Sequence, residues 1–561
     1  MKNFICLMLT IYLAFSLKID RSKTIKEIKL KKKLIGEENQ LKQIYQGALP
    51  ENYTIEFDED YIITQISWTK KDNYKYNYLL GIFEGSNDKS FLNGIPIGII
   101  KEKDGLNEIN YLDIISPNSF KYIRYIPPNK NNTNFGQIQI FGYLKSESNY
   151  LNEEKYLQVT NLPLVSINTE NSNEPSRWVG DINCTITIIN EGKIENSENG
   201  VIKVRGRTTS ILSSKKPYRI KFSTKQKILN FKGKEKKWTL IANHFDRSLL
   251  RNNLAFKISE LIGLKYTPRC LPVDVILNGN FRGNYYICDK IEIGKNRINI
   301  TKMEKTDINE PNITGGYLLQ IDSLSKLYPN GFELSKGLIG LILYPEDDEI
   351  TEEQKSYITY RLNKFEDEIY NGILDSIDLD SYSRYFIMEE FSGDIDHLWS
   401  SFYFTKERHD DKFYFGPAWD FDLAFDNEKR LIPTNNKTEF CFNYGDSAGT
   451  MRQLVEALIG NKIVIENIKK TWEKLCETVL NDKILVDFLN EEKMKIKESA
   501  ELNFLKWDNF VEEPDPGMPF IIDFGRKGED FDFSVEVVKD YVKDRFKSLT
   551  NLINDAILRA K

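Results

Sequence analysis

The chain has 561 residues, enough for two to four domains, and a formal net charge of −6. Hydrophobic residues make up 40% of it and aromatic residues 12%, so a wholly disordered chain is excluded. The negative charge gives no reason to expect nucleic acid as the main partner, and three histidines are too few for histidine-rich metal sites.

The first residues predict a secretory signal peptide at 1–16. Lys2 precedes a largely apolar run from Phe4 to Phe15, which is too short for a good membrane span. We expect cleavage after Ser16, a secreted protein in the extracellular space or the lumen of the secretory pathway, and no membrane span once the peptide is removed. A retained signal anchor is the weaker alternative.

The cysteines and the glycosylation sequons also bear on the prediction of a secreted protein. Cleavage removes Cys6 and leaves five of the six cysteines, so at least one thiol is free or pairs with another chain. Cys270 and Cys288 flank a predicted hairpin, where a disulfide is one of the options. Six N-x-S/T sequons are compatible with a glycoprotein, at Asn52, Asn131, Asn183, Asn299, Asn312 and Asn436.

The next two segments differ sharply in pattern. Residues 17–47 are lysine-rich and predict a linker or a solvated helix. Residues 48–148 form short alternating segments separated by turn residues, which is typical of an all-β sandwich. The runs LLGIFEGSNDKSF, FKYIRYIPPN and IQIFGY resemble a discoidin-like (coagulation factor 5/8 type C) jelly roll, which implies a glycan or cell-wall ligand. We expect Trp68 and Tyr122 in the core first, and on a sugar platform second.

A strand, a loop and a second strand are predicted over 200–222. Apolar residues alternate in the second strand with Arg219 and Lys221, so one of its faces presents cations. A triphosphate site needs a cation beneath a loop rich in small and hydroxyl residues, and the loop that begins at Arg205 is of that kind. Lys221 is the first candidate for the phosphate-binding cation, with Lys216 and Arg219 behind it. A solvated basic strand face is the alternative.

Further elements follow in order. Residues 238–243 predict a strand, and a helix follows Asp246 with Arg251 in its early turns, where it either contacts phosphate or cross-links the structure. Asn278-Gly279 separates two apolar runs and predicts a β-hairpin. Helices are expected in the second half of the chain, over 351–390, 451–510 and 533–558.

Two acidic clusters flank a second predicted hairpin, with strands at 402–405 and 412–415. Because antiparallel strands joined by a turn bring their outer ends together, the hairpin delivers both clusters to the same end of a sheet. A phosphoryl-transfer site needs one carboxylate that accepts a hydroxyl proton and another that holds Mg²⁺ on the phosphates. We predict Asp396 as catalytic, supported by Asp394, and Asp420 as a metal ligand, helped by Asp422. The alternative is that all four only cap turns.

The motif GDIDHLWSSFYF, followed by GPAWDFDLAF, is similar to the catalytic core of the CotH kinase family of atypical protein kinases. Upstream, KVRGRTTSILSSKKPYRIKF, WTLIANHFDRSLLRNNLAFKI, GNYYICDKI and GGYLLQID fall in the family's order. The resemblance implies an α+β kinase-like fold over 160–560, with a β-rich N-lobe and a helical C-lobe. It also implies transfer of the γ-phosphate of ATP to protein serine or threonine, with Mg²⁺ or Mn²⁺. Residues expected at the nucleotide are Lys221, Lys216, Arg219, Arg205 and Arg251.

Three positions depart from the family's pattern. Asp289 stands where the family usually has Glu, Gln320 where it often has an acid, and Ser401 where protein kinases have a metal-binding Asn. These departures favour the alternative function, a catalytically inactive cell-surface or matrix adhesion protein with a glycan-binding module. A metal-dependent hydrolase is a third, weaker hypothesis.

Overall fold

The protein was analysed as a computed structural model, in which the following residues are described: 42–50, 52–70, 78–101, 109–114, 116–128, 135–147, 155–428, 439–444, 449–507 and 530–560. The predicted signal peptide at 1–16, most of the predicted linker, and the sequons at Asn131 and Asn436 lie outside these residues.

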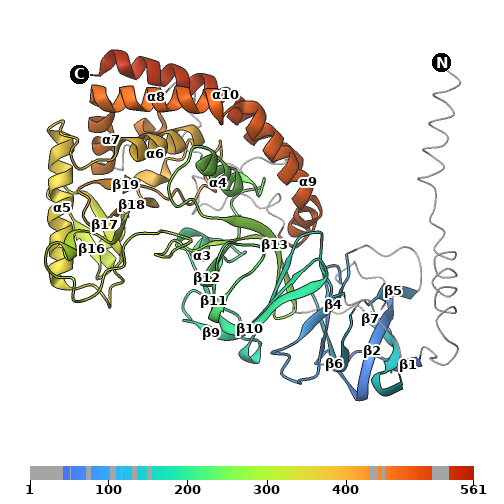
Figure 1. Cartoon of the computed structure of the whole chain (residues 1–561). Helices are drawn as coiled ribbons and strands as arrows, with labels where there is room; N and C mark the ends of the chain where they lie inside the picture. Colours follow the sequence, from blue (N-terminus) through green and yellow to red (C-terminus); the bar gives the residue numbers. More distant parts are fainter. Residues whose placement is uncertain are drawn as a thin grey trace, which may run out of the picture.

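The first part of the described chain is all β (blue in Figure 1). Its strands are β1 (Lys42–Gly47), β2 (Thr54–Lys70), β3 (Ile82–Ser86), β4 (Ile95–Ile99), β5 (Ile109–Asp113), β6 (Ser119–Ile126) and β7 (Phe135–Leu144). The 17-residue β2 is long enough to pair with three strands, β5, β6 and β7. Trp68 lies in the core, only 3% exposed, whereas Tyr122 is half-buried. Because β1 pairs with β7, residues 42–47 are a strand and not part of a linker.

A closed barrel follows (teal to green in Figure 1), in the order β10-β11-β12-β14-β13-β8-β9. Its strands are β8 (Leu164–Thr169), β9 (Ile182–Asn190), β10 (Lys193–Val204), β11 (Tyr218–Gln226), β12 (Glu235–Ile241), β13 (Cys270–Leu277) and β14 (Asn280–Asp289). The hairpin predicted at Asn278-Gly279 is confirmed, and φ values of 52° and 70° give these residues the left-handed conformation that its tight turn requires. The short helix α3 (Thr208–Leu212) lies between β10 and β11, and α4 (Arg251–Leu261) between β12 and β13.

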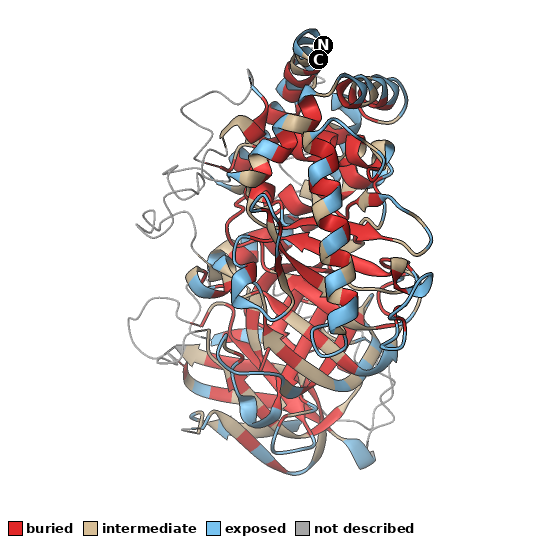
Figure 2. Ribbon diagram, turned by 90° about the vertical axis from the view of Figure 1, so that its left-hand side faces the viewer, coloured by how far each residue is buried: buried red, intermediate tan, exposed pale blue. Residues whose placement is uncertain are grey.

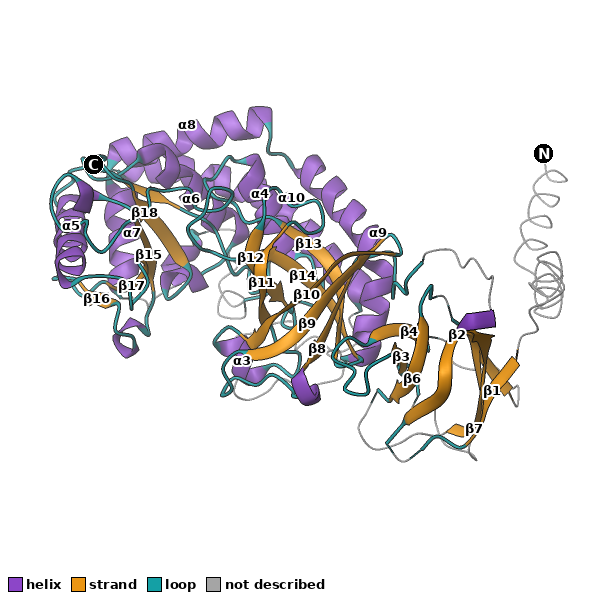
Figure 3. Cartoon of the chain, turned by 60° about the horizontal axis from the view of Figure 1, so that its bottom comes forward, coloured by secondary structure: helices purple, strands orange, loops and turns teal. Residues whose placement is uncertain are grey.

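The last part combines a second sheet with a layer of helices (Figures 1 and 3). Its sheet runs β16 (Gly331–Glu333), β17 (Ile339–Tyr344), β15 (Tyr317–Ile321), β18 (Phe402–Lys406) and β19 (Phe413–Phe415). Its helices are α5 (Glu352–Tyr370), α6 (Leu379–Ser392), α7 (Thr450–Gly460), α8 (Lys462–Thr478), α9 (Asp482–Lys506) and α10 (Phe531–Arg559). The predicted hairpin is confirmed as β18 and β19, and the predicted helical half is confirmed as α5 to α10.

The three parts are packed against one another. The apolar side chains of Ile82, Phe281 and Leu502 belong to one buried cluster, which joins the seven-stranded sheet of β1 to β7 to the barrel and to α9. Buried residues therefore continue through the barrel and the helices, whereas the outer helix faces are exposed (Figure 2). Helix α9 runs from the helical layer down beside the barrel (Figure 1), where Asn503 accepts a 2.8 Å hydrogen bond from the fully buried Lys215.

Two whole-chain observations complete the fold. Cys270 and Cys288 form a disulfide between the neighbouring strands β13 and β14, in direct register. Among the helices that the structure describes, none combines the length and the apolar character needed to cross a membrane.

Candidate active site

The C-terminal end of α6 delivers Asp394 and Asp396. Gly393 ends the helix with a φ of 67°, and its N–H donates to the carbonyl of Glu389 at 3.0 Å, which is a common glycine helix end. The chain then turns so that the Asp396 N–H donates to Oδ1 of Asp394 at 3.0 Å. Asp394 is buried, whereas Asp396 is half-buried and reaches solvent.

Asp420 lies in the segment that follows β19 and has a φ of 77°. This left-handed conformation is uncommon for a residue other than glycine, and such strain is found most often at functional sites. The two residues that follow it are held in place: the Phe421 N–H donates to Oδ1 of Asn252 at 2.9 Å, and the Asn427 amide donates to the Asp422 carbonyl at 2.7 Å.

The two acidic clusters predicted from the sequence come together in space. Burial raises the pKa of Asp422 well above its usual value, and the charges of Asp420 and Asp396 raise it further. Burial, followed by Glu389, Asp396 and Asp420, does the same for Asp394. Asp420 itself is open to solvent, yet desolvation by the surrounding protein is the largest cause of its raised pKa. Several carboxylates are therefore crowded at one place, which is costly without a bound cation.

Asp246 is a further member of this acidic centre that the sequence pattern did not reveal. Its charge helps to raise the pKa of Asp422. Its Oδ2 accepts the Arg251 N–H at 2.8 Å, and its Oδ1 pairs with the fully buried guanidinium of Arg251 at 2.5 Å. Nε of Arg251 also donates to the Phe425 carbonyl at 3.3 Å. Of the two roles considered for Arg251, its contacts therefore support the cross-link and not the phosphate contact.

Arg205 is the cation that acts on the acidic centre. Its guanidinium lies 5.4 Å from the centre of the Trp419 ring, and its charge lowers the pKa of Asp420. Its neighbour Arg207 forms an ion pair with the buried Asp322. The rim of the barrel is thus joined to the second sheet beside the acids.

Three other basic residues were predicted to contact the nucleotide. Arg219 pairs with Asp181. Lys216 donates to the Ser210 carbonyl at 3.0 Å and so supports the α3 loop. Lys221 is half-buried on the outer face of β11, and within the described part of the chain its ammonium makes no ion pair. The backbone N–H of Arg205 donates to the carbonyl of Pro217, and Lys221 lies four residues beyond Pro217. About 13 Å of strand therefore separate Lys221 from the position opposite Arg205.

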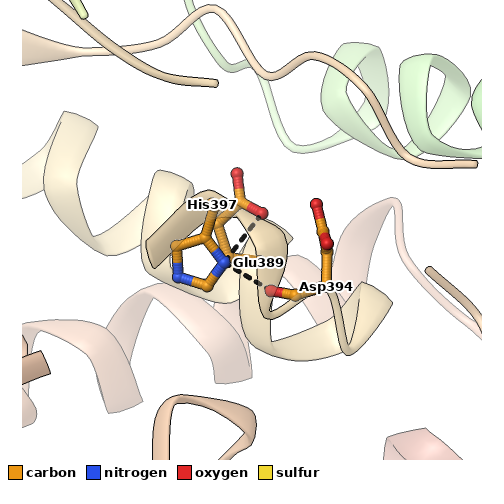
Figure 4. Close-up of side chains that lie close together, drawn as sticks. All are labelled: Glu389, Asp394 and His397. Carbon is orange, nitrogen blue, oxygen red and sulfur yellow. Dashed lines mark hydrogen bonds and ion pairs between the residues drawn. The ribbon is translucent and has the colours of Figure 1, made fainter. Parts of the chain in front are cut away.

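Glu389, Asp394 and His397 form the one group of three described residues whose side chains could share a metal ion, with ligand atoms within 4.8 Å of one another. Figure 4 shows His397 between the Glu389 carboxylate and the Asp394 carbonyl, while the Asp394 carboxylate points away. Burial lowers the pKa of His397 to about 4, so the neutral ring donates from Nδ1 to that carbonyl. Nδ1 is the ring nitrogen that faces Glu389 and Asp394, and it is occupied by this hydrogen bond, so we interpret the group as a support that fixes Asp394.

The three departures from the family pattern have structural explanations. Asp289 does not pair with Lys221: its carboxylate binds Arg269 at 2.6 Å and Arg297 at 3.1 Å. Gln320 donates to Asp322 at 3.5 Å. Ser401 lies directly before β18 and has a φ of 61°.

Comparisons with known proteins agree with the motifs. A family model described as CotH kinase protein matches residues 202–549. No curated protein matches the chain. Among solved structures, CBM62 from Clostridium thermocellum Xyl5A is 29% identical to it, and the match covers 16% of this chain and 63% of that chain. Its TM-score is 0.15, so it carries no argument about the fold.

Proposed function

The chain belongs to the CotH kinase protein family, and from this premise we propose that it is a secreted atypical protein kinase that transfers the γ-phosphoryl group of ATP to protein serine or threonine. The single observation that carries this proposal is the acidic centre, in which the charges of Asp396 and Asp420 raise the pKa values of their neighbours Asp394 and Asp422 beside Arg205. Phosphoryl transfer needs this combination of acids and a cation.

Asp396 is the proposed catalytic base, because it is half-buried and reaches solvent where an acceptor could approach. In the proposed step, the acceptor oxygen forms a bond to the γ-phosphorus and the bond from phosphorus to the bridging oxygen breaks, so that ADP leaves. The hydroxyl proton passes to Asp396. Asp394 supports this residue, since its Oδ1 accepts the Asp396 N–H.

Asp420 and Asp422 are the proposed ligands of Mg²⁺ or Mn²⁺. Their fit to a hard cation is supported by their oxygen donors and by their raised pKa values, because a cation would relieve the crowding of negative charge. Bound Mg²⁺ would neutralise charge on the β- and γ-phosphates. The residues of this chain would hold and orient it.

Arg205 is the cation best supported as a contact of the transferred phosphate, because its charge already reaches Asp420. Lys221 remains a proposed contact for a more distant part of the nucleotide, since it lies on the outer face of β11 and its ammonium is not committed to an ion pair within the described residues. The basic lining of this face suits a triphosphate.

Secretion is supported by the disulfide between Cys270 and Cys288, because such bonds persist mainly in oxidising compartments.

For residues 48–148 we propose a glycan or cell-wall ligand, on the basis of the discoidin-like sequence motifs. A glycan array probed with the full chain tests this part, and uniform absence of binding would contradict it.

Radiolabel transfer tests the proposed activity. The purified chain with labelled ATP and Mg²⁺ should label itself or casein, and Asp420→Asn should abolish the label. Asp487→Asn, which changes an exposed aspartate on α9, is the matched control and should label normally. Equal label with Asp420→Asn and wild type would refute the proposal.

A further inference from the structure

A basic cavity of about 360 Å³ lies where β14 leaves the barrel. Residues after β14 form one wall, and the loop before β13 forms another. Five cationic side chains and one acidic side chain line it: Lys232, Arg269, Lys290, Lys295, Arg297 and Asp289. A concave site lined mainly by charges of one sign concentrates the electric field and attracts counter-ions.

The wall of the cavity is rigid. The disulfide joins Cys270 to Cys288 and holds the next residues along each strand, Arg269 and Asp289, side by side. Arg269 donates to both oxygens of Asp289, at 2.6 and 2.9 Å, and Arg297 donates to it at 3.1 Å. Both arginines are thus fixed, and the one acidic group of the lining is already neutralised. A preformed wall of this kind lowers the cost of ordering on binding.

Two of the three lysines supply charge that is not committed elsewhere. Within the described residues the ammonium groups of Lys232 and Lys295 have no ion pair, and both side chains are exposed. Lys290 differs from both, since its side chain is half-buried and its ammonium lies 3.3 Å from the carboxylate of Glu292. Lysine ammonium groups bind phosphate as mobile point charges.

An apolar wall separates the cavity from the acidic centre. Ile291 lines the cavity and also packs against the cluster that contains Trp419, Tyr286 and Cys288. Asp420 and Arg205 do not line the cavity. The two places are therefore distinct in the described part of the chain.

We propose that this cavity binds a condensed phosphate anion, of which inorganic pyrophosphate is the simplest example. Arg269, Arg297 and Lys290 are already ion-paired, whereas within the described residues the ammonium groups of Lys232 and Lys295 are available. Because the cavity volume exceeds the needs of one phosphate group, a ligand with at least two phosphoryl groups could contact both lysines. The proposal does not depend on phosphoryl transfer at the acidic centre.

Isothermal titration calorimetry of the full chain with pyrophosphate, at low salt and without Mg²⁺, tests this binding. Lys232→Ala/Lys295→Ala should weaken binding at least about tenfold, because two charged contacts are removed. The matched control, Lys225→Ala/Lys483→Ala, removes two exposed lysines outside the cavity and should bind as wild type does. Sulfate, with a single anionic centre, should bind more weakly than pyrophosphate.

Three results would overturn the proposal. One is the absence of pyrophosphate binding by the wild-type chain. Another is a loss of binding in Arg205→Ala but not in Lys232→Ala/Lys295→Ala, which would assign the anion to the acidic centre instead. The third is sulfate binding as tight as pyrophosphate binding, which would exclude a preference for condensed phosphate.

Discussion

The Arg205 guanidinium, at the rim of the barrel, lies 5.4 Å from the centre of the Trp419 ring, which precedes Asp420. Trp419 is buried against Phe256 of α4 and Tyr403 of β18. The ring that the Arg205 guanidinium contacts is therefore fixed in the core. A cation over an aromatic face is attracted by the ring quadrupole. This contact holds the positive charge of Arg205 close to Asp420, whose pKa it lowers.

Replacement of Arg205 should therefore affect the use of ATP more than replacement of the other basic residues nearby. We expect Arg205→Ala to reduce kcat/KM for ATP about tenfold or more, because a charge-assisted contact to phosphate is lost. Arg219→Ala is the matched control, since its guanidinium is occupied by Asp181. Steady-state kinetics decide between them, and a larger effect of Arg219→Ala would contradict the assignment.

Replacement of Asp396 and replacement of Asp420 should cause different kinetic defects. Asp396→Asn should lower kcat by roughly 10² to 10⁴ with little change in ATP binding, because the lost group acts on the acceptor hydroxyl. Asp420→Asn should weaken the binding of ATP with Mg²⁺. Kinetics and calorimetric titration of both variants separate the roles. Identical defects, or full turnover by Asp396→Asn, would show that the roles are wrongly divided.

The disulfide should contribute to the stability of the barrel. Cys270 and Cys288 are 18 residues apart, so the bond removes unfolded-state entropy worth about 3 kcal/mol in the loop-closure account. We expect Cys270→Ser/Cys288→Ser to lower the free energy of unfolding in urea by an amount of that order. Cys476→Ser, which changes a free thiol, is the control. Unchanged stability of the double variant would argue against a structural role for the bond.

Asp274 should make stability depend on pH. It is fully buried, and burial raises its pKa from 3.8 to about 6, although Thr160 and Ser499 both donate to it at 2.6 Å. Below the unfolded value both states hold the proton. Between pH 3.8 and about 6 the unfolded chain loses the proton while the folded chain keeps it, so this group lowers stability as pH rises.

Asp274→Asn should remove that dependence. Relative to wild type, its free energy of unfolding should rise by up to about 3 kcal/mol between pH 4 and pH 7, as the pKa difference implies. Urea unfolding at several pH values measures this, with Asp487→Asn as the exposed control. A constant difference across the range would contradict the raised pKa.

Elements with a strong local signal could be predicted from the sequence. Asn278-Gly279 can adopt positive φ values with little strain, so its hairpin was readable without tertiary information. The same holds for the hairpin of β18 and β19, and for α10, which has a cap at Asp530. The acids of the candidate site were found because they lie before and after the hairpin of β18 and β19 in the sequence.

The features that were missed depend on contacts between distant residues. The parallel pairing of β8 with β13 joins Val165 to Val275, and no local pattern specifies such a pair. Asp246 has the appearance of an ordinary helix cap until the fold brings it near Asp422. The partners of Asp289 were likewise hidden, because they are set by barrel closure and by the disulfide and not by spacing.

A crystal of the chain with Mn²⁺ and a non-hydrolysable ATP analogue, examined by anomalous scattering, tests the central claim most directly. We predict a manganese peak bounded by the carboxylates of Asp420 and Asp422, with the terminal phosphate of the analogue facing Arg205. A peak held instead by Glu389, Asp394 and His397, or a nucleotide bound away from Arg205, would contradict it.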